Sequence, residues 1–267
     1  MAGLHGRVAI VTGATQGLGL AIARAFVDAG AHVVIAGIDD EAGRVAAQAM
    51  GPNALYVHTD ITVDEQIDAC VAAAREKFGS VDFLVNNACI YDDAGLDSTR
   101  AQWMQTLNVN LVSAAIFAQK ASAIMPNDGV IVNLGSTGGK FGAAGRATYP
   151  ASKAALIQVT RNMARTLGQR GVRCLSVSPG WTWSPSMDRM SGGSMDKADA
   201  VGAPLHPLGR VGRAEEVATA VLFACSPQAS WMTGTDIAVD GGFSSLGPDQ
   251  GRSPRDWFAA SASSSSS

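Results

Sequence analysis

The sequence lacks any block of basic residues. Its 267 residues carry a net charge of −3, with 20 lysines and arginines set against 23 acidic residues. Because nucleic acids and anionic membranes are recognised by clustered cations, neither is expected as a partner. Long hydrophobic runs are also missing. The N-terminal MAGLHGRVAIVTG has no charged-then-apolar signal architecture and is far too short in apolar residues to span a bilayer. We therefore expect a cytoplasmic protein.

Cysteine and histidine are scarce, with four of each. The cysteines show no C-x-x-C and no repeated spacing, which predicts small buried apolar residues in a reducing compartment. The histidines show no metal-ligand spacing, so no metal site is expected. No repeat with a period of about 20 to 50 residues is visible, which argues against a solenoid.

What the sequence does contain is an alternation of short apolar runs with longer, alanine-rich, helix-like segments. The runs are continuous rather than alternating in hydrophobicity, as in strands that are covered on both faces. This pattern predicts a single α/β domain over residues 1–246, a doubly wound (Rossmann-type) parallel sheet of seven strands with helices on both faces. The expected strand segments begin at Arg7, His32, Leu55, Val81, Gly129, Val172 and Thr235.

Two regions interrupt this alternation. Residues 181–213 are rich in Gly, Pro, Ser and Met, and a loop of that length predicts a lid or substrate-binding segment. The second is the tail, residues 247–267, whose final serines we expect to be disordered. A shorter signal, TVDE at residues 62–65, predicts a capping box at the start of a helix.

A glycine-rich segment, TGATQGLG at residues 12–19, joins the first expected strand to the first helix. Gly13 would permit a tight turn, Gly17 would let the backbone approach a pyrophosphate, and Gly19 would allow the helix to pack closely on the strand. The helix N-terminus would then direct free N–H groups at phosphates. The spacing is G-x-x-x-G-x-G, and the alternative is a glycine-rich turn without a ligand. Its place between strand and helix favours a dinucleotide site.

A second motif is TYPASK, in which Tyr149 and Lys153 are four residues apart and share one face of a helix. A phenol, with an ordinary pKa of about 10, is a poor base at neutral pH, and a nearby ammonium favours the phenolate. Ser136 ends the strand segment GVIVNLGS, at the edge of the sheet where ligands bind. A tyrosine–lysine pair alone usually lies on the surface, but the preceding serine favours an active site.

With these motifs the chain resembles the short-chain dehydrogenase/reductase family over residues 4–243. The segments TGATQGLG, NNAC, SPGWTWSP and PLGRVGRAEEVA…DGG match the family's T-G-x-x-x-G-x-G, N-N-A-G, P-G-x-x-x-T and C-terminal signatures in order. Asn110 in NVNL falls at the family's helix asparagine, and Ser136, Tyr149 and Lys153 match its active-site residues. Cys89 departs from the pattern because it replaces the glycine of N-N-A-G.

The resemblance implies an NAD(P)-dependent oxidoreductase that interconverts a secondary alcohol and a ketone. Tyr149 would be the general acid/base, and Ser136 would hold the reacting oxygen. Lys153 would bind the nicotinamide ribose and favour the tyrosinate, and Asn110 would anchor a proton-relaying water chain. Family members of this length are mostly dimers or tetramers, so a homo-oligomer is expected. The RDWF segment of the tail is expected to dock over the active-site mouth of its own or a neighbouring subunit.

The resemblance also implies the binding residues of the cofactor and of a small-molecule substrate. The substrate pocket would be lined by Ser136, Gly138, Tyr91, Phe141, Trp181 and Trp183. The cofactor would contact Gly13, Thr15, Gln16, Gly17, Leu18, Gly19, Ile38, Asp39, Asp60, Ile61, Asn87, Ala88, Tyr149, Lys153, Pro179, Gly180, Thr182 and Ser184, the last of which stands where the family usually has a threonine.

The choice between NAD and NADP depends on HVVIAGIDDE, at residues 32–41. NAD-selective relatives carry the ribose-binding acid at the position of Gly37, and NADP-selective ones follow a small residue there with an arginine. Here Ile38 follows the glycine, so a 2′-phosphate would meet acids without a cation. Asp39 is expected to turn inward as a displaced ribose acid, which favours NAD. Arg44 is the residue that could reach back to a phosphate.

The substrate class stays open at this point. A small cyclic or aromatic alcohol, a sugar and a hydroxysteroid fit the tryptophan-containing lid about equally. A reductase of 3-oxoacyl thioesters on an acyl carrier protein is the first alternative, but its docking surface should be basic. Around the lid no basic cluster is visible, because Arg189 and Lys197 are offset by Asp188, Asp196 and Asp199. The alternative of another class is a catalytically idle family member that only binds or regulates.

Overall fold

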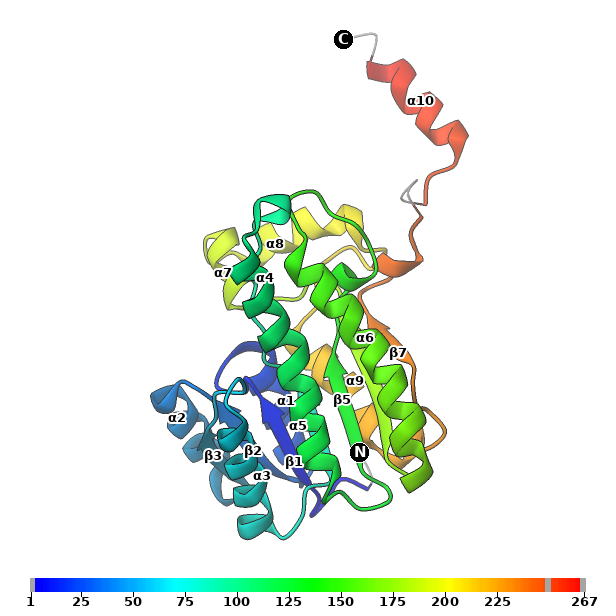
Figure 1. Ribbon diagram of the computed structural model, residues 1–267. Coiled ribbons are helices and arrows are strands. Elements are labelled where there is room, and N and C mark those ends of the chain that lie inside the picture. Colours follow the sequence, from blue (N-terminus) through cyan, green and yellow to red (C-terminus); the bar gives the residue numbers. More distant parts are fainter. Residues whose placement is uncertain (1–2, 248–250, 265–267) are drawn as a thin grey trace.

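The computed structural model describes residues 3–247 and 251–264, and its centre is one parallel sheet of seven strands (Figure 1). The strand order is β3-β2-β1-β4-β5-β6-β7. The predicted doubly wound sheet is therefore confirmed. The strands are β1 (Val8–Thr12), β2 (His32–Gly37), β3 (Ala54–His58), β4 (Phe83–Asn86), β5 (Val130–Leu134), β6 (Arg173–Pro179) and β7 (Asp236–Val239).

The strand β1 lies at the point where the direction of winding reverses. It pairs with β2 on one side, with Val8 opposite His32, and with β4 on the other, with Ala9 opposite Phe83. Connections that leave β1 and β4 run to opposite faces of the sheet, so a crevice opens at their carboxyl ends. The glycine-rich segment and NNAC both lie at this crevice.

Helices cover both faces of the sheet because successive side chains of each strand point in opposite directions. Along β1, Ala9 and Val11 join one buried cluster, while Val8 and Ile10 join the other. The first cluster is covered by α1 (Gly17–Asp28), α2 (Asp40–Met50) and α9 (Ala214–Cys225). The second is covered by α3 (Asp64–Phe78), α5 (Ser113–Ser122) and α6 (Thr148–Leu167).

The helix α4 (Arg100–Leu107) continues into α5 through one π-helical turn, Asn108–Val112. A π turn inside an α-helix often marks a functional site. Short 3-10 helices link other elements: Gly51–Asn53, Gly95–Asp97, Thr137–Gly139, Gly168–Arg170, Ala203–Leu205, Pro227–Ala229 and Phe243–Ser245. None of the described helices is long and apolar enough to cross a membrane.

The segment predicted as a lid loop, residues 181–213, contains two short helices, α7 (Pro185–Ser191) and α8 (Met195–Gly202). They are short, and the sequence marks them by their ends: a serine N-cap on each, and Pro185 and Gly192 at the two ends of α7. Within the segment, an ion pair at 2.6 Å joins Asp199 of α8 to Arg213, the residue that precedes α9.

The predicted capping box at residues 62–65 is wrong. Helix α3 begins at Asp64, and Val63 occupies the N-cap position without a side-chain bond. The hydroxyl of Thr62 donates instead to Asp60 Oδ1 at 2.7 Å, and the same oxygen accepts from the Thr62 N–H at 2.9 Å. Because the Thr62 hydroxyl is bonded to Asp60, it does not cap α3.

The tail contains a helix, α10 (Pro254–Ser264), that stands off the body of the protein (Figure 1). The RDWF segment lies in α10, and Trp257 packs under the Arg252 guanidinium at 4.4 Å. The prediction that RDWF docks over its own active-site mouth is therefore wrong for this structure; docking on a neighbouring subunit stays a prediction. Part of the serine run is helical, and residues 265–267 lie outside the described residues.

Candidate active site

The glycine-rich segment forms a cradle at the carboxyl end of β1. Gly13 and Gly17 have φ of +62° and +56°, a conformation that favours glycine. A Cβ atom on Gly13 would lie 2.9 Å from the Cα of Ala88, and one on Gly19 would overlap the carbonyl oxygen of Gly13. All three glycines are thus required sterically, and the N-terminus of α1 opens onto the cradle. These residues fit the pyrophosphate of a dinucleotide.

The NNAC segment is fastened to the end of β1. The Thr12 hydroxyl oxygen accepts hydrogen bonds from the N–H groups of Asn87 at 3.0 Å and Ala88 at 3.1 Å. The Asn87 side chain donates back to the Thr12 carbonyl at 2.9 Å. This reciprocal bonding fixes the crevice wall that carries the next residue, Cys89.

Three predicted catalytic side chains meet beside Gly138. Tyr149 and Lys153 lie in the first two turns of α6, and Pro150 falls in the first turn, where its missing N–H costs little. The Lys153 ammonium donates to the Leu134 carbonyl at 2.7 Å and lies 5.7 Å from the centre of the Tyr149 ring.

The Ser136 hydroxyl oxygen accepts from the Gly138 N–H at 3.0 Å, which leaves its proton available to a ligand. A Cβ atom on Gly138 would lie 3.3 Å from Ser136 Oγ and 3.6 Å from Tyr149 Cε1. Both side chains therefore border the same small space, and only a glycine leaves that space open.

Asn110 lies within the π-helical turn and is buried. Its side chain accepts from the Ile90 N–H at 2.8 Å and donates to the Ile90 carbonyl at 3.0 Å and to Ser152 Oγ at 3.1 Å. Ser152 in turn donates to the Tyr149 carbonyl at 2.7 Å. Asn110 thus ties the segment after β4 to the helix that carries Tyr149, and both of its amide hydrogens are used within the protein.

One residue that sequence reasoning missed is Asp93, whose side chain is 0% exposed. Its carboxylate accepts from the N–H groups of Ala147 at 2.8 Å, Tyr149 at 3.1 Å and Gly95 at 3.0 Å. It therefore caps the N-terminus of α6 from a segment more than 50 residues away. These backbone donors hold the pKa of Asp93 below its ordinary value even though burial acts to raise it.

A cavity of about 700 Å³ opens above these side chains. All six predicted substrate residues line it: Tyr91, Ser136, Gly138, Phe141, Trp181 and Trp183. Of the predicted cofactor residues, Leu18, Asn87, Tyr149, Lys153, Pro179, Gly180, Thr182 and Ser184 line it as well. The others lie outside it, at the glycine cradle, at the ends of β2 and β3, and beside Asn87: Gly13, Thr15, Gln16, Gly17, Gly19, Ile38, Asp39, Asp60, Ile61 and Ala88.

Within the cavity Tyr91 stacks on Tyr149, with ring centres 4.8 Å apart. The neighbouring Cys89 thiol and burial of the hydroxyl raise the pKa of Tyr91 well above its ordinary value. Tyr91 therefore stays neutral. Ser184 caps α7 by accepting from the Met187 N–H at 3.2 Å, so its hydroxyl proton is still free to bond a ligand.

The end of β2 is acidic, and its acids are engaged within the protein. Asp39 caps α2 by accepting from the Ala42 N–H at 3.0 Å. Asp40 bonds the Tyr56 hydroxyl and His58 Nδ1, both at 2.7 Å, and these two bonds lower its pKa below the ordinary value. Arg44 lies 4.0 Å from Asp40, on the same exposed helix.

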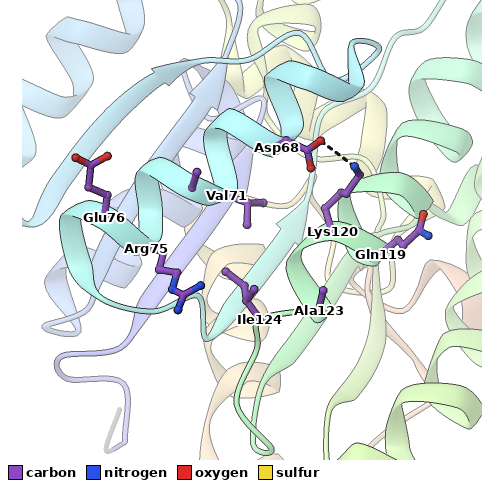
Figure 2. A pocket seen from close by; sticks show the side chains of 9 residues that line it. Asp68, Val71, Arg75, Glu76, Gln119, Lys120, Ala123 and Ile124 are labelled. Carbon is purple, nitrogen blue, oxygen red and sulfur yellow. Dashed lines mark hydrogen bonds and ion pairs between the residues drawn. The ribbon is translucent and has the colours of Figure 1, made fainter.

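A second hollow lies between α3 and α5 (Figure 2), and none of the predicted catalytic residues lines it. The ion pair of Lys120 with Asp68, at 2.8 Å, lies at its edge. Glu76 and Arg75 also border it, but its lining holds no serine, cysteine, histidine or tyrosine and no buried polar side-chain atom that lacks a partner, among the described residues. Within the described part of the chain no group of histidine, cysteine or acidic side chains could hold a metal ion.

Comparison with known proteins agrees with this architecture. The model of a family described as "Enoyl-(Acyl carrier protein) reductase" matches residues 13–244. The cis-4-hydroxycyclohexanecarboxylate dehydrogenase of Sinomonas cyclohexanicum is 36% identical over 90% of this chain and 97% of its own length. The sorbitol dehydrogenase of Cereibacter sphaeroides is 34% identical over 90% of this chain and 98% of its own.

The chain is also similar to a solved structure, a glucose/ribitol dehydrogenase of the short-chain dehydrogenase/reductase type from Brucella melitensis. The two share 33% identity with a TM-score of 0.83, over 90% of this chain and 97% of that one. The protein belongs to the short-chain dehydrogenase/reductase family of oxidoreductases.

Proposed function

We propose that this chain is an NAD-dependent oxidoreductase that interconverts a secondary alcohol and a ketone. The observation that carries the proposal is the meeting of Ser136, Tyr149 and Lys153 at one cavity beside the glycine cradle. When bound, the nicotinamide supplies or accepts the hydride. The names of the relatives support an alcohol-oxidising role, since two are dehydrogenases of polyols or cyclic alcohols.

The chain's own residues handle the proton. In the oxidation direction Tyr149, with the Lys153 ammonium 5.7 Å from its ring centre, acts as the general base and takes the proton from the substrate hydroxyl. In the reduction direction the Tyr149 hydroxyl returns it to the ketone oxygen. Ser136 donates its remaining hydroxyl proton to the same oxygen and stabilises the charge that develops there. Asn110 would hold the proton-relaying water by the backbone of its π turn.

NAD is the nucleotide that the end of β2 fits best. A Cβ atom on Gly37 would lie 2.8 Å from Thr15 Cγ2, so the strand end is kept small. Ile38 follows it, 68% exposed, and the next residues are acids. A 2′-phosphate placed there would be repelled by these acids, and Arg44 on the following helix already lies 4.0 Å from Asp40. Initial rates with NAD and NADP at matched concentrations test this choice.

Tyr149→Phe tests the reaction. The variant keeps the ring that stacks on Tyr91 and loses only the hydroxyl. We expect cofactor reduction with a panel of polyols, aldoses and cyclic alcohols to fall by roughly 100-fold or more. Unchanged oxidation would contradict the assigned role. The panel should include a 3-oxoacyl thioester, because the matched family model is described as a reductase of acyl-carrier substrates. A clear preference for the thioester would replace the alcohol proposal.

A further inference from the structure

The charged side chains that line the active-site cavity are all cations. They are Arg146, Lys153 and Lys197, and no aspartate or glutamate of the described chain lines it. The count of charges around the lid therefore misleads, because Asp188, Asp196 and Asp199 do not line the cavity. Lys153 belongs to the catalytic group, which leaves two cations without a role in the chemistry: Arg146 from the segment before α6 and Lys197 from α8.

Arg146 lies three residues before Tyr149, outside α6, and its guanidinium carbon lies 5.6 Å from the centre of the Tyr149 ring. Its side chain is 43% exposed. The carboxylate nearest to it is that of Asp93, 3.9 Å from Nε, which is too far for a hydrogen bond. Asp93 is occupied by three backbone N–H groups. The Arg146 guanidinium therefore has donors to spare beside the catalytic ring.

Lys197 comes from the lid helix α8 and is exposed. Asp199, two residues further on, is committed to Arg213 at 2.6 Å and accepts from the Val211 N–H at 3.2 Å. Among the described residues no carboxylate forms an ion pair with Lys197. The rest of the cavity wall is largely apolar, with Trp181, Trp183 and Phe141 among its members.

We propose that the substrate of this cavity is an apolar ring that carries a carboxylate as well as the reacting alcohol. This inference rests on the proposed function for the alcohol end only. The alcohol oxygen lies at Ser136 and Tyr149, the ring lies on the tryptophans, and the carboxylate pairs with Arg146, with Lys197 closing from the lid. Arginine suits this task because its planar donors match a carboxylate in pairs.

The binding test compares two unreactive ligands of nearly equal shape, cyclohexanecarboxylate and cyclohexanecarboxamide. Isothermal titration of the full chain, with and without NAD, should show the carboxylate binding roughly tenfold or more tightly, as expected for a charge-assisted hydrogen bond. Arg146→Gln should reduce this preference to within about threefold, and Lys197→Gln should weaken it by a smaller factor. Arg189→Gln, an exposed cation of α7 outside the cavity wall, is the matched control and should keep the preference.

Salt provides a test that needs no variant. Because the pairing is electrostatic and near the surface, the preference for the carboxylate should shrink as salt rises from about 0.02 M to about 0.5 M. Equal affinity of the wild-type chain for the acid and the amide would overturn the proposal. Tighter binding of a coenzyme A thioester than of cyclohexanecarboxylate would overturn it too, because the cations would then serve a phosphate-bearing carrier.

Turnover separates this inference from the proposed reaction. 4-Hydroxycyclohexanecarboxylate should be oxidised with a kcat/KM roughly tenfold or more above that of its carboxamide, mainly through KM. If neutral alcohols are oxidised as well as the acid, the reaction stands and the carboxylate site is refuted. If the carboxylate binds selectively but no alcohol in the panel is oxidised, the anion site stands and the reaction is refuted.

Discussion

The buried carboxylate of Asp93 accepts a hydrogen bond from the backbone N–H of Tyr149, at 3.1 Å. It also accepts from Ala147, so the first turn of α6 is held by a side chain that lies outside that helix. Free N–H groups at a helix start need such acceptors, and α6 has no capping side chain of its own. The orientation of the proposed general acid/base therefore depends on a residue that does not touch the substrate.

Asp93→Asn should lower kcat with little change in KM. The amide keeps one acceptor oxygen but turns an NH₂ group toward backbone N–H groups, which moves the start of α6 and with it Tyr149. We expect a roughly tenfold loss of kcat and destabilisation of roughly 1–3 kcal/mol. Activity assays on folded protein, thermal melts and the pH profile of kcat distinguish the loss of activity from the loss of stability. Asp92→Asn is the matched control, because among the described residues the Asp92 carboxylate accepts a hydrogen bond from Gln102 alone. A lower melting temperature with normal kcat and pH profile would reduce Asp93 to a structural role.

Thiol reagents should distinguish Cys89 from the other three cysteines. Burial raises the pKa of Cys70 to about 11 and those of Cys174 and Cys225 to about 12, so these thiols hold little reactive thiolate at pH 8. Cys89 is partly exposed and lines the cavity. Titration of the native protein at pH 8 should label one thiol quickly, against four after denaturation.

The same labelling should inactivate the enzyme, because a group attached to Cys89 would occupy the cavity beside Tyr149. Cys89→Gly restores the residue that the family pattern carries and should be active and resistant to the reagent. Rapid labelling of the glycine variant would show that another cysteine is the accessible one.

Ile38→Arg should shift the cofactor preference toward NADP. An arginine at this exposed position would supply the cation that the strand end lacks and pair with a 2′-phosphate. We expect kcat/KM with NADP to rise by roughly tenfold, while that with NAD changes little. Val45→Arg, on the exposed face of α2, adds the same charge elsewhere and should leave the ratio unchanged. An equal response of both variants would place the nucleotide away from the end of β2.

Acid should weaken the ion pair between Arg210 of the lid segment and Glu216 of α9. The Arg210 guanidinium, bonded to Glu216 at 2.6 Å, lowers the pKa of that carboxyl from 4.5 to about 2. Since the pKa is lowered in the folded state, the stabilisation is fully present above pH 4.5 and is lost as the pH falls toward 2. The pair is partly exposed, so its contribution is expected to be below about 1 kcal/mol.

Thermal melts of wild type and Glu216→Gln between neutral pH and acid test this sign. The wild type should melt higher at pH 7, and the gap should narrow below pH 4.5. Glu215→Gln removes a neighbouring acid that forms no recorded ion pair in the described chain, and it should show no such gap. A gap that widens on acidification would contradict the assignment.

The sequence predicts the framework well because its signals are local. Continuous apolar runs mark strands that are buried on both faces, and all seven appear where the runs lie. The glycine cradle is equally local, since the conformations at Gly13 and Gly17 depend on a few adjacent residues. What escapes prediction depends on partners distant in sequence. Asp93 and Ala147 are 54 residues apart, and nothing near either indicates the pairing.

The placement of charges around the cavity could not be predicted from the sequence, for the same reason. In the sequence the lid carries both cations and aspartates, yet of its charged side chains in the described structure only Lys197 lines the cavity. The capping box fails because Asp60, outside the four-residue motif, takes the Thr62 hydroxyl. The two lid helices are too short for hydrophobic periodicity to reveal them. The bond between Asp60 and Thr62 and the charges around the cavity both depend on residues outside a short sequence motif, so the motif alone could not predict them.

The central position of β1 in the sheet affects how the protein folds while it is being synthesised. This strand is synthesised first, yet its second partner in the sheet is β4, which pairs Phe83 with Ala9. The Val8 N–H is also accepted by Asp82, at 2.8 Å. Until Phe83 has emerged, β1 can pair with β2 on one side only, and its other edge stays open. All five positions of β1 are buried in the finished sheet, and an open edge of this kind favours association between nascent chains. We therefore expect self-association to be strongest while only the N-terminal half of the protein has been made.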